Sequence, residues 1–167
     1  SSTIEYADSA ISQSLKSIAQ VMFADIGTRV FYTQHGSFDT HSGEIASHQK
    51  LWSDLSIGLA DFMDDLKEHG KDKDTIIFLF SEFGRRIKDN GAGTDHGSGG
   101  VAFIIGGAVN GGLHGRYPSL QEKNQVEGDL AFNNDFRSSY STIADKWLGI
   151  DPEVVSNGNF DGLDFLY

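Results

Sequence analysis

The chain has 167 residues, of which 24 are acidic and 13 are lysine or arginine, so its formal net charge is −11. With 38% apolar and 22% charged residues it has the composition of a single globular domain, which argues against disorder. The negative charge argues against binding nucleic acid or an anionic membrane through bulk charge, and the absence of cysteine excludes disulfides and thiolate metal ligands.

The first half of the chain predicts two helices around one strand. Apolar residues recur at helical spacing over residues 4–24, which predicts a helix. Residues 28–33 are β-branched and aromatic and predict a strand, and residues 34–43 form a polar loop. A second helix is predicted over residues 44–69, with Gly70 as its stop.

The second half predicts two strands and a last helix. Residues 75–80 are apolar throughout, as in a parallel strand that is buried on both faces. The glycine-rich residues 88–100 are interpreted as a loop, and residues 101–105 as a further strand. A helix follows from residue 134 or 135 to Gly149. This order predicts that residues 1–167 form one α/β layered domain, with a mostly parallel sheet flanked by helices.

Ionisable residues follow the predicted strands, where parallel α/β sheets bind ligands. His35, Asp39 and His41 follow the first strand. Ser81, Glu82 and Arg85 follow the second, and Asp95 and His96 come next. We expect these segments to converge on one site.

The residue types in these segments suit a divalent metal ion. Asp39 and His41 stand two residues apart, Asp95 and His96 are adjacent, and Glu82 adds a carboxylate. Carboxylates and imidazoles without thiolates suit zinc, manganese or iron. Such an ion can polarise a phosphoryl oxygen and lower the pKa of a bound water to about 7.

Ordinary structural roles remain open for the same residues. An Asp-x-His pair in a loop is often an Asx turn or a simple hydrogen bond, which applies to Asp39 and His41. Glu82 and Arg85 could form a salt bridge at a strand end, or Arg85 could bind an anionic substrate. His48 lies on the second predicted helix and could only border the core.

Six segments, in chain order, resemble the DUF1501 family: residues 36–41 (GSFDTH), 81–85 (SEFGR), 93–97 (GTDHG), 106–112 (GGAVNGG), 135–137 (DFR) and 147–149 (WLG). The resemblance implies a further link, to the alkaline phosphatase/sulfatase superfamily. The resemblance implies a partial alkaline-phosphatase-like core with one or two divalent metals and hydrolysis of phosphate or sulfate esters. It also implies that the chain is the C-terminal part of a longer family protein.

The resemblance also implies roles for particular residues. By position, Asp39 and His41 resemble the first ligand group of the superfamily, and His96 resembles a later histidine ligand. Glu82 stands where the superfamily has an aspartate, and a phenylalanine follows it where a histidine ligand would stand. We therefore expect Asp39, His41, His96 and Glu82 to bind the metal, zinc first and manganese or iron as alternatives. We expect Glu82, Arg85 and Asp95 to be the catalytic residues.

The expected function is metal-dependent hydrolysis of phosphate (mono-, di- or triester) or sulfate esters, with a small anionic ester as substrate. We expect no nucleic acid or membrane partner, and a homodimer is a further expectation. The alternatives are a non-catalytic metal- or anion-binding module and an incomplete fragment of a larger enzyme. The resemblance implies export to the periplasm, although the first residues show no signal peptide.

Overall fold

The computed structural model describes residues 2–167. Its internal contacts gather into two compact units. The first unit contains the residues up to Thr75 together with Asp89–Asp95. The second contains Ile76–Lys88 and His96–Tyr167.

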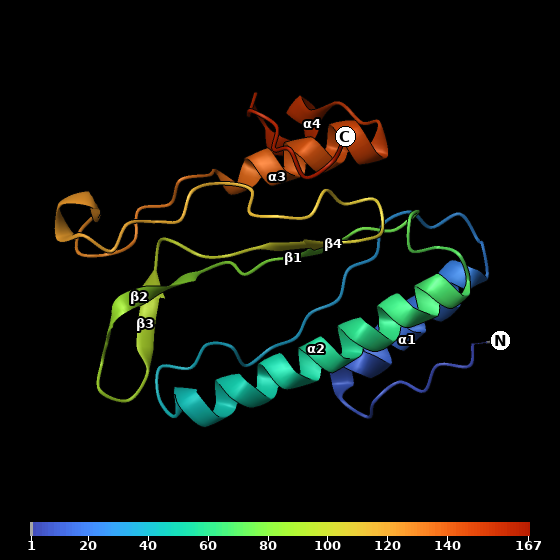
Figure 1. Ribbon diagram of the computed structural model, residues 1–167, viewed down its shortest axis with the longest axis horizontal. Coiled ribbons are helices and arrows are strands. Elements are labelled where there is room, and N and C mark those ends of the chain that lie inside the picture. The colour runs from blue at the N-terminus through green and yellow to red at the C-terminus, as the bar shows by residue number, and fades with distance from the viewer. Residues whose placement is uncertain (1) are drawn as a thin grey trace. The chain divides into compact units, whose positions relative to one another are not determined.

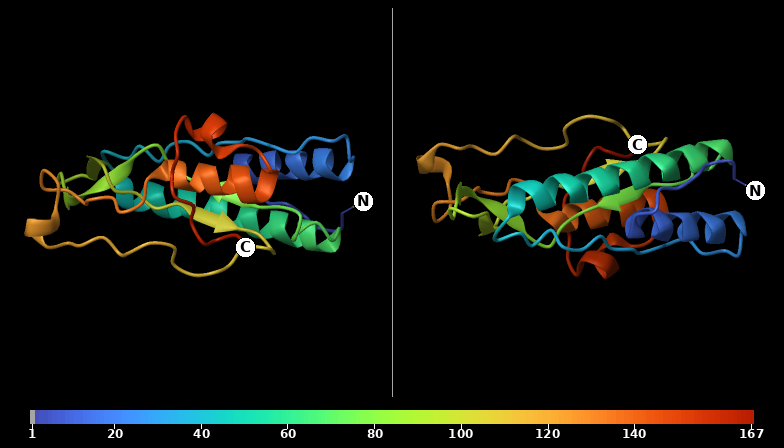
Figure 2. Two further views of the ribbon diagram at one scale, coloured as in Figure 1. Left: turned by 90° about the horizontal axis from the view of Figure 1, so that it is seen from above. Right: turned by 90° about the horizontal axis from the view of Figure 1, so that it is seen from below.

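Two helices that lie side by side form the first unit (Figures 1 and 2). Helix α1 spans Ala10–Phe23 and α2 spans Glu44–Glu68. Their buried side chains form the core of the unit: Ile11, Leu15 and Ala19 from α1, and Leu55, Phe62 and Leu66 from α2. Both predicted helices are confirmed, although the first begins later than expected, after the N-cap residue Ser9.

The segment between these helices is not the predicted strand. Residues 28–33 have no regular secondary structure, and Val30 and Tyr32 are 68% and 77% exposed. A β-branched and aromatic sequence forms a strand only where another strand pairs with it and a core covers one face. Among the described residues, neither sheet includes this segment, so its strand propensity alone does not produce a strand.

The second unit contains a short antiparallel pair, so the prediction of a mostly parallel sheet is wrong. Strand β1 (Ile77–Leu79) pairs with β4 (Phe103–Ile105) in antiparallel register. Parallel pairing needs a crossover connection, usually a helix, whereas the chain between these strands contains a hairpin and no helix. The residues of β1 are only half-buried, so their apolar character does not reflect burial on both faces.

A β-hairpin replaces the predicted glycine-rich loop. Strands β2 (Gly84–Asp89) and β3 (Thr94–Gly97) form a second two-stranded antiparallel sheet. Its turn is closed by Asn90, whose side-chain oxygen accepts hydrogen bonds from the backbone N–H groups of Ala92 and Gly93, at 3.0 and 2.8 Å. The described residues thus contain two antiparallel sheets and four helices, and no alkaline-phosphatase-like parallel core.

The C-terminal part of the second unit is helical. Helix α3 (Phe136–Thr142) begins after the N-cap Asp135 and continues as a π-helical turn over Ile143–Leu148. Gly149 ends it with a φ of +64°, as predicted. A short helix that the sequence did not predict, α4, spans Pro152–Ser156. Among the described residues, no helix is long and apolar enough to cross a membrane.

Candidate functional site

The loop that precedes α2 carries an exposed carboxylate–imidazole pair. His41 Nδ1 lies 2.9 Å from Oδ1 of Asp39, and both side chains are about half exposed. Because the carboxylate accepts, Nδ1 is the ring nitrogen that carries a hydrogen toward Asp39. A carboxylate that orients a histidine through one ring nitrogen prepares the other nitrogen for metal binding.

The tip of the hairpin braces this loop within the first unit. The side-chain amide of Asn90 donates to the backbone oxygen of His41 at 3.2 Å and to Oδ1 of Asp95 at 3.1 Å. The backbone N–H of Gly43 donates to the carbonyl of Ala92 at 3.0 Å. One amide therefore links the predicted residues His41 and Asp95, although they lie far apart in the sequence.

Close backbone approach at the tip requires a glycine. A Cβ atom on Gly93 would lie 2.5 Å from the backbone oxygen of Thr40, well inside van der Waals contact. Beside it, the hydroxyl of Thr94 donates to Oε2 of Glu44 in the first turn of α2, at 2.8 Å. Both contacts fix the start of α2 and the loop before it against the hairpin tip.

His96 follows Asp95 directly and belongs to the second unit. Its ring stacks on Phe83, with centroids 4.0 Å apart and an interplanar angle of 8°. The guanidinium of Arg85 lies 4.9 Å from the centroid of the same Phe83 ring, and Nε of Arg86 donates to the backbone oxygen of His96 at 3.4 Å. Phe83 cannot bind a metal, but here it sets the plane of the His96 ring.

The predicted site residues differ in their exposure and in the contacts that hold them. Asp39 and His41 are exposed in the first unit and His96 is exposed in the second, and their predicted role as metal ligands stays a prediction. Asp95 is held through Asn90. Glu82 is exposed in the link between β1 and β2, and its predicted role as a ligand or catalytic residue stays a prediction.

His35 and His48 pack against aromatic side chains. The ring of Phe38 makes edge-on contacts with His35, His48 and Trp52, with centroids 5.5 to 5.6 Å apart. In addition, Nε2 of His35 lies 3.1 Å from the backbone oxygen of Leu51. These contacts favour a packing role for both histidines.

The sequence reasoning missed the two residues that organise the site, Asn90 and Gly93. A signal for the first was present, because Asn-Gly is a common turn dipeptide in β-hairpins. The interpretation of residues 88–100 as a loop passed over that dipeptide. No sequence signal pointed to the close approach of Gly93 to Thr40, which depends on tertiary packing.

Residues 4–159 match the family described as a protein of unknown function (DUF1501), so the chain belongs to that family. This confirms the family resemblance, whereas the link to the alkaline phosphatase superfamily stays a prediction. No curated protein and no solved structure matches the chain.

Proposed function

We propose that this chain binds a divalent metal ion, zinc in the first place, through Asp39, His41 and His96, and that it serves in the hydrolysis of phosphate or sulfate esters. The observation that carries the proposal is the 2.9 Å pair of Asp39 and His41 on a loop braced by the hairpin tip. One carboxylate and two imidazoles without a thiolate form a donor set that suits zinc, and manganese or iron as alternatives.

The neighbours of these ligands support the proposal. Asp39 fixes the ring orientation of His41 through Nδ1. The stack on Phe83 orients His96, and Asn90 ties the preceding residue to the His41 backbone. Rigid support of this kind lowers the entropy cost of assembling a ligand set.

Three side chains would assist the metal ion in the proposed hydrolysis. When bound, a divalent ion supplies Lewis acidity toward a phosphoryl or sulfuryl oxygen. In the proposal Arg85 offers a planar cation for the anionic group of the ester. Glu82 and Asp95 are the carboxylates proposed to complete the ligand set or to transfer protons.

Likeness in motif order to the alkaline phosphatase/sulfatase superfamily supports the choice of phosphate and sulfate esters. The proposal depends on the ligand residues and not on a shared fold, because the described residues contain no parallel sheet. The proposal rests only on residues of this chain.

A second candidate function is metal binding without turnover. All three proposed ligands are exposed, and catalysis of ester hydrolysis benefits from a site that excludes water. Zinc-dependent stabilisation of the chain without hydrolysis of any ester in a panel would favour this candidate.

The deciding experiment measures bound zinc by elemental mass spectrometry in wild type, His41→Ala and His96→Ala after loading and desalting. His114→Ala is the matched control, because His114 contacts the backbone oxygen of Asn110 at 2.7 Å and lies outside the proposed ligand set. We expect near-stoichiometric zinc in wild type and control, and about tenfold less in the other two variants. Equal zinc in all four proteins, or none in wild type, would refute the metal site.

Turnover is tested on the same samples with p-nitrophenyl phosphate, bis-p-nitrophenyl phosphate and p-nitrophenyl sulfate. We expect activity that is lost on chelation, restored by zinc and absent in His41→Ala. Activity that is indifferent to chelator would contradict the hydrolase proposal. Stoichiometric zinc with no turnover of any ester would replace it by the non-catalytic candidate.

A further inference from the structure

The turn at the tip of the hairpin contains an Asn-Gly dipeptide, Asn90-Gly91, within the first unit. In such a dipeptide the backbone nitrogen of the glycine can attack the side-chain amide carbon of the asparagine and close a five-membered succinimide ring. Glycine carries no Cβ that would obstruct the attack. Two more Asn-Gly dipeptides begin at Asn110 and Asn157. The surroundings of Asn90 differ from those of the other two and supply the groups that this reaction requires.

The nucleophile of the reaction is hydrogen-bonded to a carboxylate. The backbone N–H of Gly91 donates to Oδ1 of Asp89, the last residue of β2, at 2.9 Å. A carboxylate within hydrogen-bond reach of the proton to be removed has the position of a general base. Among the described residues, no carboxylate accepts a hydrogen bond from the N–H of Gly111 or of Gly158. The base is therefore particular to the hairpin turn.

The carbonyl that is attacked is polarised by two backbone donors. Oδ1 of Asn90 accepts from the N–H groups of Ala92 and Gly93, at 3.0 and 2.8 Å. Two backbone N–H groups at this distance stabilise the negative charge that develops on the oxygen in a tetrahedral intermediate, as an oxyanion hole does. By comparison, Oδ1 of Asn110 accepts from the exposed hydroxyl of Tyr167, at 3.2 Å. The stronger polarisation is therefore at Asn90.

The remaining contacts of Asn90 hold the turn in one conformation. Its Nδ2 donates to the backbone oxygen of His41 at 3.2 Å and to Oδ1 of Asp95 at 3.1 Å. Its backbone N–H donates to the carbonyl of Gly93 at 2.9 Å, which closes the turn. Base, nucleophile and polarised carbonyl thus belong to one fixed turn, and fixed reacting groups lose less entropy on the way to the transition state.

We propose that Asn90 and Gly91 form a site of autocatalytic deamidation, with Asp89 as the base. The Gly91 nitrogen passes its hydrogen to Asp89 and bonds to Cγ of Asn90. The bond from Cγ to Nδ2 then breaks, and Nδ2 takes up the proton and leaves as ammonia. Water opens the succinimide ring and leaves an aspartate or an isoaspartate at position 90. This inference is independent of the proposed function, because the reaction involves neither a metal ion nor an ester.

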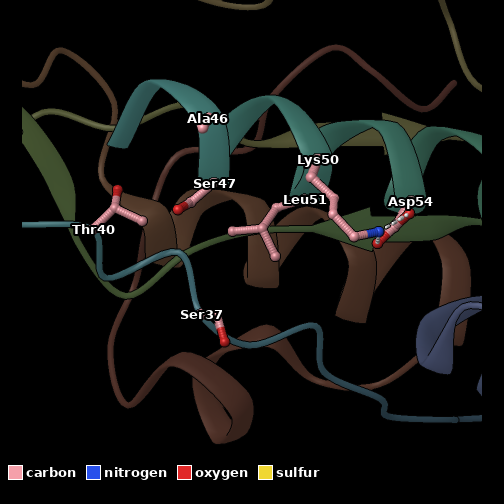
Figure 3. Close-up of a pocket in the computed structure, with 7 residues that line it drawn as sticks. All are labelled: Ser37, Thr40, Ala46, Ser47, Lys50, Leu51 and Asp54. Atoms are coloured by element: carbon pink, nitrogen blue, oxygen red, sulfur yellow. Dashed lines mark hydrogen bonds and ion pairs between the residues drawn. The ribbon is translucent and has the colours of Figure 1, made fainter. Parts of the chain in front are cut away.

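Loss of this amide releases the loop that carries Asp39 and His41. A carboxylate at position 90 has no N–H to donate to the His41 carbonyl, and it repels the carboxylate of Asp95. An open hollow lies between this loop, at Thr40, and helix α2, at Ser47 (Figure 3). The hairpin turn therefore supports the loop at a point where the helix does not, and modification of one side chain removes that support.

The test is to incubate the full chain at physiological temperature and pH and to follow each Asn-Gly site by peptide mass spectrometry. Trypsin leaves Asn90 and Asn110 in one peptide, residues 89–116, so fragment ions compare the two sites directly. A parallel sample in guanidinium chloride gives the rates of the unfolded chain. In the folded chain we expect Asn90 to react at least about tenfold faster than Asn110 and Asn157. It should also react faster than it does in denaturant, where the three rates should be similar.

Asp89→Asn keeps an oxygen acceptor for the Gly91 N–H but removes the base, and it should slow the reaction at Asn90 by at least about tenfold. Asp74→Asn is the matched control variant, because it removes the same charge in the turn after α2 and should leave the rate unchanged. An Asn90 rate in the folded chain that is no higher than in denaturant would overturn the proposal. So would a rate equal to that of Asn110, or an unchanged rate in Asp89→Asn.

Discussion

The buried contact between Tyr6 and Asp65 offers a sharp test of how the first unit is stabilised. The Tyr6 hydroxyl donates to Oδ2 of Asp65 at 2.8 Å, and the two residues are 8% and 2% exposed. His69 Nδ1 lies 3.2 Å from the other carboxylate oxygen, but its hydrogen bond goes to the Asp65 backbone oxygen, at 3.0 Å. The tyrosine hydroxyl is therefore the principal hydrogen-bond donor to a buried carboxylate.

Replacing Tyr6 by phenylalanine removes that donor and keeps the ring. A hydrogen bond to a charged group contributes about 1.5–3 kcal/mol, and the loss leaves a buried acceptor that water does not reach. No large cavity forms, because only one oxygen atom is deleted. We therefore expect Tyr6→Phe to lower the free energy of unfolding by about 1.5–3 kcal/mol.

The two tryptophans allow the measurement to be confined to one unit. Trp52 lies in the first unit and Trp147 in the second. In a Trp147→Phe background, tryptophan fluorescence during urea denaturation reports on the first unit alone. Stability is compared from the urea midpoints, provided that the slope stays constant between variants.

The same contact predicts a dependence on alkaline pH. Burial first, and then the hydrogen bond to Asp65, raises the pKa of the Tyr6 phenol above its ordinary value of 10.0. Because the folded state holds this proton more tightly than the unfolded state, the stabilisation is complete below pH 10 and is lost as pH rises above it. Tyr6→Phe should lack this part of the alkaline decline.

Two results would refute this reasoning. A Tyr6→Phe variant as stable as its parent would mean that the hydroxyl contributes no net free energy. An identical alkaline decline in the variant and its parent would mean that other groups cause it. The other tyrosine phenols provide a common background, which is present in both proteins and cancels in the comparison.

Two further predictions concern other contacts. Gly58→Ala, a substitution that normally favours a helix, should destabilise the first unit by about 1–3 kcal/mol, because the added Cβ would lie 2.7 Å from the Ser12 hydroxyl oxygen. Urea denaturation measures this change, and a variant more stable than wild type would contradict the prediction. Hydrogen bonds from the Arg137 side chain and backbone lower the pKa of Asp135 to about 2. The stabilisation from this carboxylate is complete above its ordinary pKa of 3.8 and should be lost as pH drops toward 2. Trp147 fluorescence follows the loss. An Asp135→Asn variant whose stability declined equally with acid would refute this cause.

The helices were predictable because their signals are local. Apolar spacing over residues 44–69 and the glycine after it predicted α2 almost to the residue. Capping signals were equally local: the Asp135 side chain accepts from the N–H of Arg137 at the start of α3, close to the predicted start. In each case the side chains that decide the element are within a few residues of it.

The sheet was not predictable in the same way, because strand pairing depends on partners elsewhere in the chain. Residues 28–33 and 75–80 carry similar β-forming side chains, yet only the second segment finds a partner, at β4. An apolar run does not reveal whether its partner will be parallel or antiparallel. The inference from strand order to a parallel sheet used connection rules that assume every predicted strand to be real.

The contact between the Asp39–His41 loop and Asp95 nevertheless occurs by a different route from the one expected. The expected route was the shared carboxyl edge of a parallel sheet. In the structure, an Asn-Gly hairpin folds back within a few residues, and Asn90 links the His41 backbone to the Asp95 side chain. The Asp-x-His pair, the Asn-Gly turn and the adjacent Asp95 and His96 are all defined within short stretches of sequence. Contacts that are encoded so locally can form even when the sheet that was expected to assemble them does not exist.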